Sequence, residues 1–165
     1  MMFNKKIGFF SAIILLAGCG KESTHNQVEK HEASLYVVNV LDQAQYNDAH
    51  IKGSINIQLQ ELEEKVKDWN KDATVVFYCS NYMCTASGQA AKMLTALGFK
   101  DTRAFEGGMA EWYQLHKDDA EYALVGKAQD GYLTMVIKKP ATEPAGVQII
   151  DAKELKKLMK KANLL

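Results

Sequence analysis

The stretch that decides the fold is TVVFYCSNYMCTASGQAAKMLTAL, residues 74–97. Thr74–Tyr78 is a continuous apolar run, which is typical of a central strand of a parallel sheet. The chain leaves this strand at Cys79 and enters a helix at about Thr85, with apolar residues three or four positions apart. In a parallel sheet, the corner between a strand and the following helix lies at the carboxyl edge, where ligands bind. The sequence therefore predicts a site at this corner.

Strand and helix patterns alternate on both sides of this stretch. Alternation of this kind predicts an α/β fold with a mostly parallel sheet. The further predicted strands are Leu35–Val40, Ile55–Ile57 and Thr102–Phe105, and the further predicted helices are an amphipathic one over Leu59–Trp69 and a short one that runs from Gly107-Gly108 through Trp112.

Residues 117–165 have a different pattern of predicted elements. Tyr132–Lys138 is predicted to be a strand, and Val147–Ile150 is strand-like. Asp151–Glu154 has the pattern of a capping box and opens a helix with Leu155 and Met159 on its apolar face.

Composition excludes several classes of function. The 165 residues include 20 Lys and Arg against 20 Asp and Glu, so no basic field is available to hold nucleic acid. Arg103 is the single arginine, which excludes any clamp of two guanidinium groups. Three cysteines are too few for a disulfide scaffold. Two cysteines in one loop with scattered histidines do not make a zinc pattern, so we expect no metal and no cofactor.

The N-terminus has the features of a targeting segment. Lys5 and Lys6 precede the apolar run Ile7–Leu16, which is too short to cross a bilayer but has the length of a signal core. The run ends in Leu16-Ala17-Gly18-Cys19, which resembles the lipobox of bacterial lipoproteins. The resemblance implies a signal peptide over residues 1–18, a lipid anchor on Cys19 and an extracytoplasmic place in the cell envelope. It implies the periplasmic face of the outer membrane if the host is Gram-negative. Residues 19–33 then form a polar tether.

The corner after Thr74–Tyr78 can activate a thiol. Inward-facing amide groups of the loop and the N-terminus of the next helix lower the pKa of a cysteine at their focus. Cys79 is expected to lie there as a nucleophile. The alternative is that Cys79 is a small buried apolar residue, and the residues alone leave this open. The remaining residues of the predicted active-site loop are Ser80, Asn81, Tyr82, Met83, Cys84 and Thr85.

Four segments resemble rhodanese domains. HIKGSINI at residues 50–57 resembles the family's HIPGAINI segment, and VFYC at 76–79 resembles its strand and nucleophile. Residues 90–99 resemble the helix behind the active loop, and FEGGMAEW at 105–112 resembles the LxGGxxAW ending. The segments have the family's order and spacing, which implies a rhodanese-like domain over residues 34–116.

The resemblance implies a sulfurtransferase. Cys79 would take the outer sulfur of thiosulfate or another persulfide donor, and pass it from a persulfide to a thiol or cyanide. The loop Cys79–Cys84 has the length found in sulfurtransferases, whereas related phosphatases use a longer loop with an arginine. His50 matches a position that is usually structural.

Two departures from the family leave alternatives open. Asn39-Val40-Leu41 stands where many rhodaneses have Asp-Val-Arg, and the loop lacks the usual basic residue at Cys84. Thiosulfate would then be held by backbone amides alone, so a thiol-based donor is an equal candidate. A non-catalytic binding or sulfur-carrier module and a thiol–disulfide protein using Cys79 and Cys84 are the other functions. In the sulfurtransferase, Cys84 is a candidate resolving thiol, expected to be less exposed than Cys79.

The C-terminus suggests a circular permutation. Rhodanese domains usually open with a strand and a helix before the strand matched here by Leu35–Val40. The segment IIDAKEL at residues 149–155 resembles that opening. We therefore expect Val147–Ile150 to fill the vacant edge of the sheet. The alternatives are that residues 117–165 are an unrelated extension or the remnant of a second copy of the domain.

Overall fold

A computed structural model describes residues 34–120, 124–141 and 145–165. Cys19 and the predicted signal peptide and tether lie outside the described residues. Within the described residues, no helix has both the length and the apolar character needed to cross a membrane.

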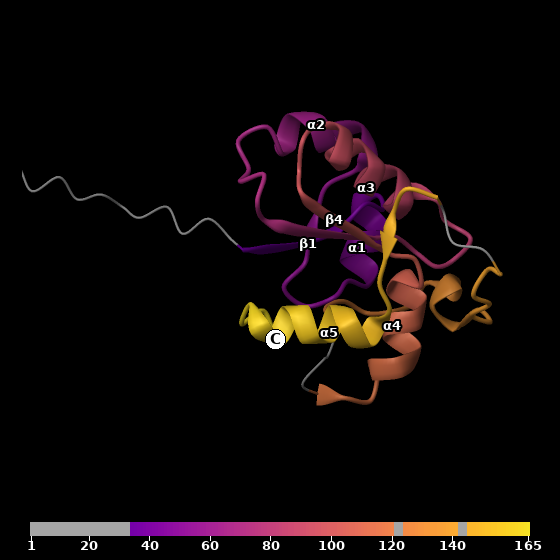
Figure 1. Cartoon of the computed structure of the whole chain (residues 1–165). Coiled ribbons are helices and arrows are strands. Elements are labelled where there is room, and N and C mark those ends of the chain that lie inside the picture. Colours follow the sequence, from indigo (N-terminus) through magenta and orange to yellow (C-terminus); the bar gives the residue numbers. More distant parts are fainter. Residues whose placement is uncertain (1–33, 121–123, 142–144) are drawn as a thin grey trace, which may run out of the picture. The chain divides into compact units, whose positions relative to one another are not determined.

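A five-stranded parallel sheet forms the centre of the domain (Figure 1), with the strand order β2-β1-β3-β4-β5. The central strand β3 pairs along its full length with β1 and β4, in the register Val37–Val76–Arg103. The strands are β1 (Leu35–Asn39), β2 (Ile55–Asn56), β3 (Thr74–Tyr78), β4 (Asp101–Phe105) and β5 (Gln148–Ile149).

Helices cover both faces of the sheet because successive strand side chains point to opposite sides. Val76 and Tyr78 of β3 belong to the core cluster that contains Trp112 and Met159, whereas Phe77 belongs to the opposite cluster. Figure 1 shows α2 and α3 on one face and α4 and α5 on the other. The helices are α1 (Gln43–Asp48), the 3-10 turn η1 (Leu59–Glu61), α2 (Leu62–Lys65), α3 (Ala86–Ala96), α4 (Gly108–His116), the 3-10 turn η3 (Gly131–Thr134) and α5 (Ala152–Lys161).

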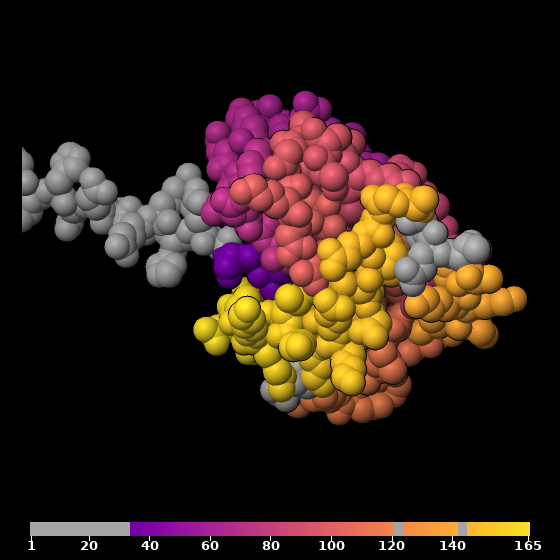
Figure 2. All heavy atoms as spheres, viewed as in Figure 1, coloured from indigo at the N-terminus to yellow at the C-terminus, as the bar shows by residue number. Residues whose placement is uncertain are grey.

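The C-terminal strand and helix complete this sheet. Gln148 and Ile149 pair with β4, which confirms the prediction that this segment joins the sheet edge. Leu155 and Met159 of α5 are fully buried, and Figure 2 shows α5 packed against the rest of the domain. The single arginine, Arg103, links the two parts, because it bonds Asp101 on its own strand and Glu154 of α5.

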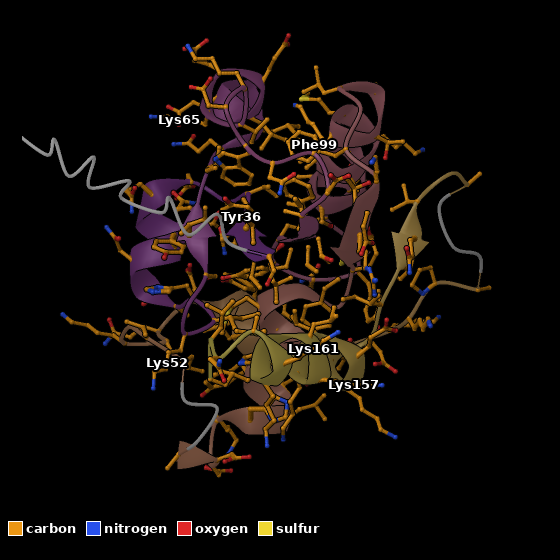
Figure 3. The ribbon with its side chains drawn as sticks, turned by 60° about the vertical axis from the view of Figure 1, so that its left-hand side comes forward. Tyr36, Lys52, Lys65, Phe99, Lys157 and Lys161 are labelled. Atoms are coloured by element: carbon orange, nitrogen blue, oxygen red, sulfur yellow. The ribbon has the colours of Figure 1, made fainter. Side chains whose placement is uncertain are left out.

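The outer face of α5 carries lysines. Lys157 and Lys161 project from it in Figure 3, one helical turn apart. The Asp151 side chain accepts a hydrogen bond from the Glu154 amide at 2.8 Å, as expected for the predicted cap. The Glu154 side chain bonds Arg103.

Three sequence-based predictions of secondary structure need correction. Tyr132–Lys138 is not a strand: η3 is a 3-10 turn, and the segment after it is irregular. The Gln114 side chain donates to the carbonyl oxygens of Leu133 and Met135, each at 2.8 Å, and so holds the chain against α4. Leu59–Trp69 is not one helix but η1 followed by the short α2. The helix α1 was not predicted, because it buries none of its residues and therefore has no apolar stripe.

Candidate active site

The loop after β3 is shaped by Asn81. The Asn81 side-chain oxygen accepts from the amide of Met83 at 2.9 Å, and its carbonyl oxygen accepts from the amide of Cys84 at 3.0 Å. These bonds form a tight turn that brings the chain back to the N-terminus of α3. The two ends of the loop, Cys79 and Cys84, therefore come together.

The N-terminus of α4 fixes the start of the loop. The amides of Met109 and Ala110 donate to the carbonyl oxygens of Cys79 and Ser80, each at 2.9 Å. This approach needs Gly108, whose φ is +60°, because a Cβ there would lie 2.5 Å from the Cys79 carbonyl oxygen. The second glycine of the Gly-Gly pair is thus explained by its contact with the loop.

Cys79 is fully buried, and its thiol is surrounded by oxygen atoms. Its Sγ lies 3.2 Å from the carbonyl oxygen of Cys84 and 3.4 Å from the Ser87 hydroxyl. Ser87 in turn donates to Oε1 of the buried Glu106 at 3.2 Å. A carbonyl oxygen can only accept a hydrogen bond, so this environment favours the protonated thiol of Cys79.

The two loop thiols influence one another, and their pKa values are shifted in opposite directions. The hydrogen bond to Cys84, together with burial, raises the pKa of Cys79. The same bond lowers the pKa of Cys84, and the backbone amides of Ala86 and Ser80 lower it further. Neither of these two cysteines is in a disulfide in this structure, and the directions of the two pKa shifts favour the thiolate on Cys84.

Two expectations about these thiols are therefore wrong for the resting loop. The loop amides were expected to lower the pKa of Cys79. Instead, the amides of Ser80 and Ala86 lower the pKa of Cys84, and Cys79 receives a hydrogen bond from the amide of Ser87. Cys84 was expected to be the less exposed thiol, but it is partly exposed while Cys79 is buried. The physical reason is that the turn at Asn81 directs the Cys84 carbonyl, rather than amides, at Cys79.

Two acidic residues near the loop were missed by the sequence analysis. Burial raises the pKa of Glu106, which lies next to the Gly-Gly pair. Glu111 of α4 accepts a hydrogen bond from the hydroxyl of Tyr82 at 2.7 Å. Both stand within the FEGGMAEW segment, Glu106 just before α4 and Glu111 in its first turn, and Ser87 lies in the first turn of α3. The start of each neighbouring helix was therefore the available signal.

A small hollow lies beside the loop. Its volume is about 60 Å³, and Asn81, Tyr82 and Met83 form one wall. The other wall is residues 135–138, and Lys138 is the one charged residue among those that line the hollow.

His50 is held by local contacts. Its Nδ1 donates to the Tyr46 carbonyl oxygen at 2.8 Å, and its ring stacks on that of Tyr46. Its backbone forms a bridge with Val125. These contacts agree with a structural role.

Comparisons with known proteins agree with this geometry. The chain is 29% identical over 93 residues to the thiosulfate sulfurtransferase GlpE of Shewanella oneidensis, which covers 56% of this chain and 90% of that protein. It is 32% identical over 81 residues to GlpE of Pseudomonas fluorescens strain Pf0-1, which covers 49% of this chain and 72% of that protein. It is also 26% identical over 98 residues to a thiosulfate:glutathione sulfurtransferase of Saccharomyces cerevisiae, which covers 52% of this chain and 69% of that protein.

A solved structure shows the same fold. The crystal structure of the BH2092 protein from Bacillus halodurans matches with a TM-score of 0.50 at 24% identity, over 61% of this chain and 70% of that one. The sequence model of the rhodanese-like domain matches residues 21–115, which contain β1 to β4 and all but the last residue of α4. The chain therefore belongs to the rhodanese-like domain family.

Proposed function

We propose that this protein is a sulfurtransferase that carries sulfane sulfur as a persulfide on Cys79. The observation that supports this most directly is the position of Cys79, at the first place of the loop between β3 and α3, with its carbonyl held by α4. Relatives named as thiosulfate sulfurtransferases match over the same region.

The first step needs Cys79 as a thiolate. Its proton passes along the hydrogen bond to the Cys84 thiolate, which leaves the charge of the pair unchanged. The transfer moves the charge from a partly exposed thiol to a buried one, which costs desolvation, and the hydroxyl and amide of Ser87, which lower the pKa of Cys79, offset part of that cost. Cys79 then attacks the outer sulfur of the donor, and the donor's remaining group leaves with the bonding electrons. For thiosulfate the leaving group is sulfite.

The second step returns the sulfur to solution. An acceptor thiolate, or cyanide, attacks the outer sulfur of the Cys79 persulfide, and Cys79 leaves as a thiolate. Lys138, which lines the hollow, would favour an anionic donor, whereas the apolar side chain of Met83 would not discriminate between donors. Thiosulfate and a small persulfide are therefore both candidate donors.

We further propose that the domain works at a membrane surface. The motif Leu16–Cys19 supports a lipid on Cys19, and the polar residues 20–27 would separate the domain from the lipid. The place would be the extracytoplasmic side of the cell envelope.

One experiment tests the chemistry. Cys79 and Cys84 fall in a single tryptic peptide, residues 72–92, whose mass reports sulfur uptake. The Cys84→Ser variant lacks the proton acceptor, so it is treated with thiosulfate, or with cysteine persulfide, at alkaline pH, where solvent can remove the Cys79 proton, and it is then digested. We expect a peptide heavier by one sulfur atom, and no such peptide from Cys79→Ser. If neither donor adds sulfur, the protein is a non-catalytic member of the family.

A further inference from the structure

The two thiols of the loop share one small space. The Cys79 Sγ is 3.2 Å from the Cys84 carbonyl oxygen, and the Cys84 thiol is near enough to raise the pKa of Cys79. The turn at Asn81 and the bonds from α4 fix both ends of the loop, so this contact is part of the loop's geometry. Any sulfur bound to Cys79 therefore has a second thiol beside it.

Cys84 has the properties of an attacking thiol. In the resting loop its pKa is lowered by the bond from Cys79 and by the amides of Ser80 and Ala86. Once Cys79 carries sulfur, the two amides remain, so they still favour loss of the proton that Cys84 took from Cys79. Thiol–disulfide exchange proceeds by attack of such a thiolate on a sulfur that it can reach. Cys84 is also partly exposed, so a released product can leave to solvent.

The contact decides which sulfur Cys84 reaches. In a Cys79 persulfide, the inner sulfur is Cys79 Sγ, the atom that already bonds Cys84. The outer sulfur extends beyond it, toward the position from which the donor came. Attack by Cys84 therefore falls on the inner sulfur, whereas an external thiol meets the outer one.

We propose that Cys84 is a resolving thiol that turns the Cys79 persulfide into free sulfide and a Cys79–Cys84 disulfide. The inference rests on the proposed function, since it starts from that persulfide. The bond between Cys84 Sγ and Cys79 Sγ forms, the sulfur–sulfur bond of the persulfide breaks, and hydrosulfide leaves with the electron pair. The sulfane sulfur is reduced, and the two cysteine thiols are oxidised.

The step has a balanced stoichiometry with thiosulfate. One reduced loop, which holds one thiol and one thiolate, and one thiosulfate give one disulfide, one hydrosulfide and one sulfite, and the single proton, which Cys84 took from Cys79, leaves on the hydrosulfide. The loop then stops after a single turnover until a dithiol reductant reopens the disulfide. Repeated turnover therefore requires a dithiol reductant. The sulfur is released as sulfide, whereas in sulfur transfer it would end as a persulfide on an acceptor thiol.

The test follows sulfide and the peptide 72–92 in one reaction. The full chain, reduced and freed of reductant, is mixed with thiosulfate, or with cysteine persulfide if thiosulfate does not load it. We expect about one sulfide per chain and a peptide lighter by two hydrogen atoms. Cys84→Ser should keep a peptide heavier by one sulfur and release sulfide at least about tenfold more slowly. Cys19→Ser is the matched control and should behave like the unchanged chain.

The outcomes separate the two proposals. If Cys84→Ser takes up sulfur but the unchanged chain keeps its persulfide equally long, the resolving role is wrong and the sulfurtransferase proposal stands. If Cys84→Ser takes up no sulfur at alkaline pH, and the unchanged chain neither takes up sulfur nor releases sulfide, while thermal melting shows that both are folded, both proposals fail. Cys84→Ala is the second variant if serine disturbs folding, and the same mass readout applies.

Discussion

Replacing Gly108 by alanine tests whether α4 holds the active-site loop. An alanine Cβ would lie 2.5 Å from the carbonyl oxygen of Cys79 and 2.8 Å from the carbonyl carbon of Ser80. The φ of +60° costs an alanine about 1–2 kcal/mol. Relief of the contact requires a backbone shift, which costs about 1–3 kcal/mol more. We therefore expect the variant to lose about 2–5 kcal/mol of unfolding free energy.

Gly98 provides a matched control. Its φ is +89°, but no atom lies within 4 Å of the position that a Cβ would occupy. Gly98→Ala should therefore show the conformational cost alone, about 1–2 kcal/mol. Urea denaturation of both variants measures the difference, which isolates the contact with the loop.

The same pair of variants should differ in chemistry. Movement of the Cys79 carbonyl displaces the thiol from Cys84 and Ser87, so sulfur uptake by Gly108→Ala should fall, while Gly98→Ala should be unaffected. Equal stabilities for the two variants, with sulfur uptake retained in both, would refute the reasoning that Gly108 is required by the loop.

Four further predictions follow from the described contacts and the sequence. Leu155→Ala should cost about 2–5 kcal/mol in urea denaturation, because the side chain is fully buried; a loss below 1 kcal/mol would show that α5 is not part of the core. Iodoacetamide should label Cys84 before Cys79 at mildly acidic pH, as measured on the purified protein by peptide fragmentation, since the pKa of Cys84 is lowered and that of Cys79 raised. Glu106→Gln should move the pH profile of Cys84 alkylation to lower pH, because a nearby negative charge raises the pKa of a thiol. An unchanged profile would show that the Glu106 carboxylate does not affect the Cys84 thiol. Cys19→Ala should leave an unprocessed or mislocalised precursor in cell fractions, and normal cleavage with soluble release would contradict lipid attachment.

The strands that the sequence predicted best are those buried on both faces. Thr74–Tyr78 and Leu35–Asn39 are apolar along their length because helices cover each side, and such runs mark strands without reference to distant residues. The helix α1 gave no such signal. It lies at the surface and is capped by Asp42, whose side chain accepts a hydrogen bond from the Gln45 amide. That capping residue was the only sign of the helix in the sequence.

Tyr132–Lys138 shows why a local pattern can mislead. The segment has β-forming residues, but Leu133 is buried against α4, and Gln114 satisfies two of its carbonyl oxygens. The Asp48 side chain accepts from the amides of Gln129 and Asp130 just before it. These partners lie far away in the sequence, and they replace the ladder bonds that a strand would have made.

The sequence predicted the position of the site but not which of its two thiols holds the proton. The order of strand, cysteine and helix placed Cys79 at the carboxyl edge of the sheet, where the structure has it. Which thiol holds the proton depends on whether carbonyl oxygens or amides face each sulfur, and one turn at Asn81 decides that. Residue types and spacing do not encode such an orientation, since the same six residues could direct amides to either end.

The segment between α4 and β5 serves both the sheet and the site. After α4 the chain must travel to the free edge of β4 in order to add β5 in parallel, and a parallel addition requires a long crossover. Residues 135–138 of this crossover form a wall of the hollow beside Tyr82 and Met83, and they contribute Lys138 to it. The connection that completes the sheet therefore places a lysine among the residues that line a hollow beside a loop with no lysine or arginine of its own. That connection lies outside residues 21–115, the part of the chain that the family's sequence model matches.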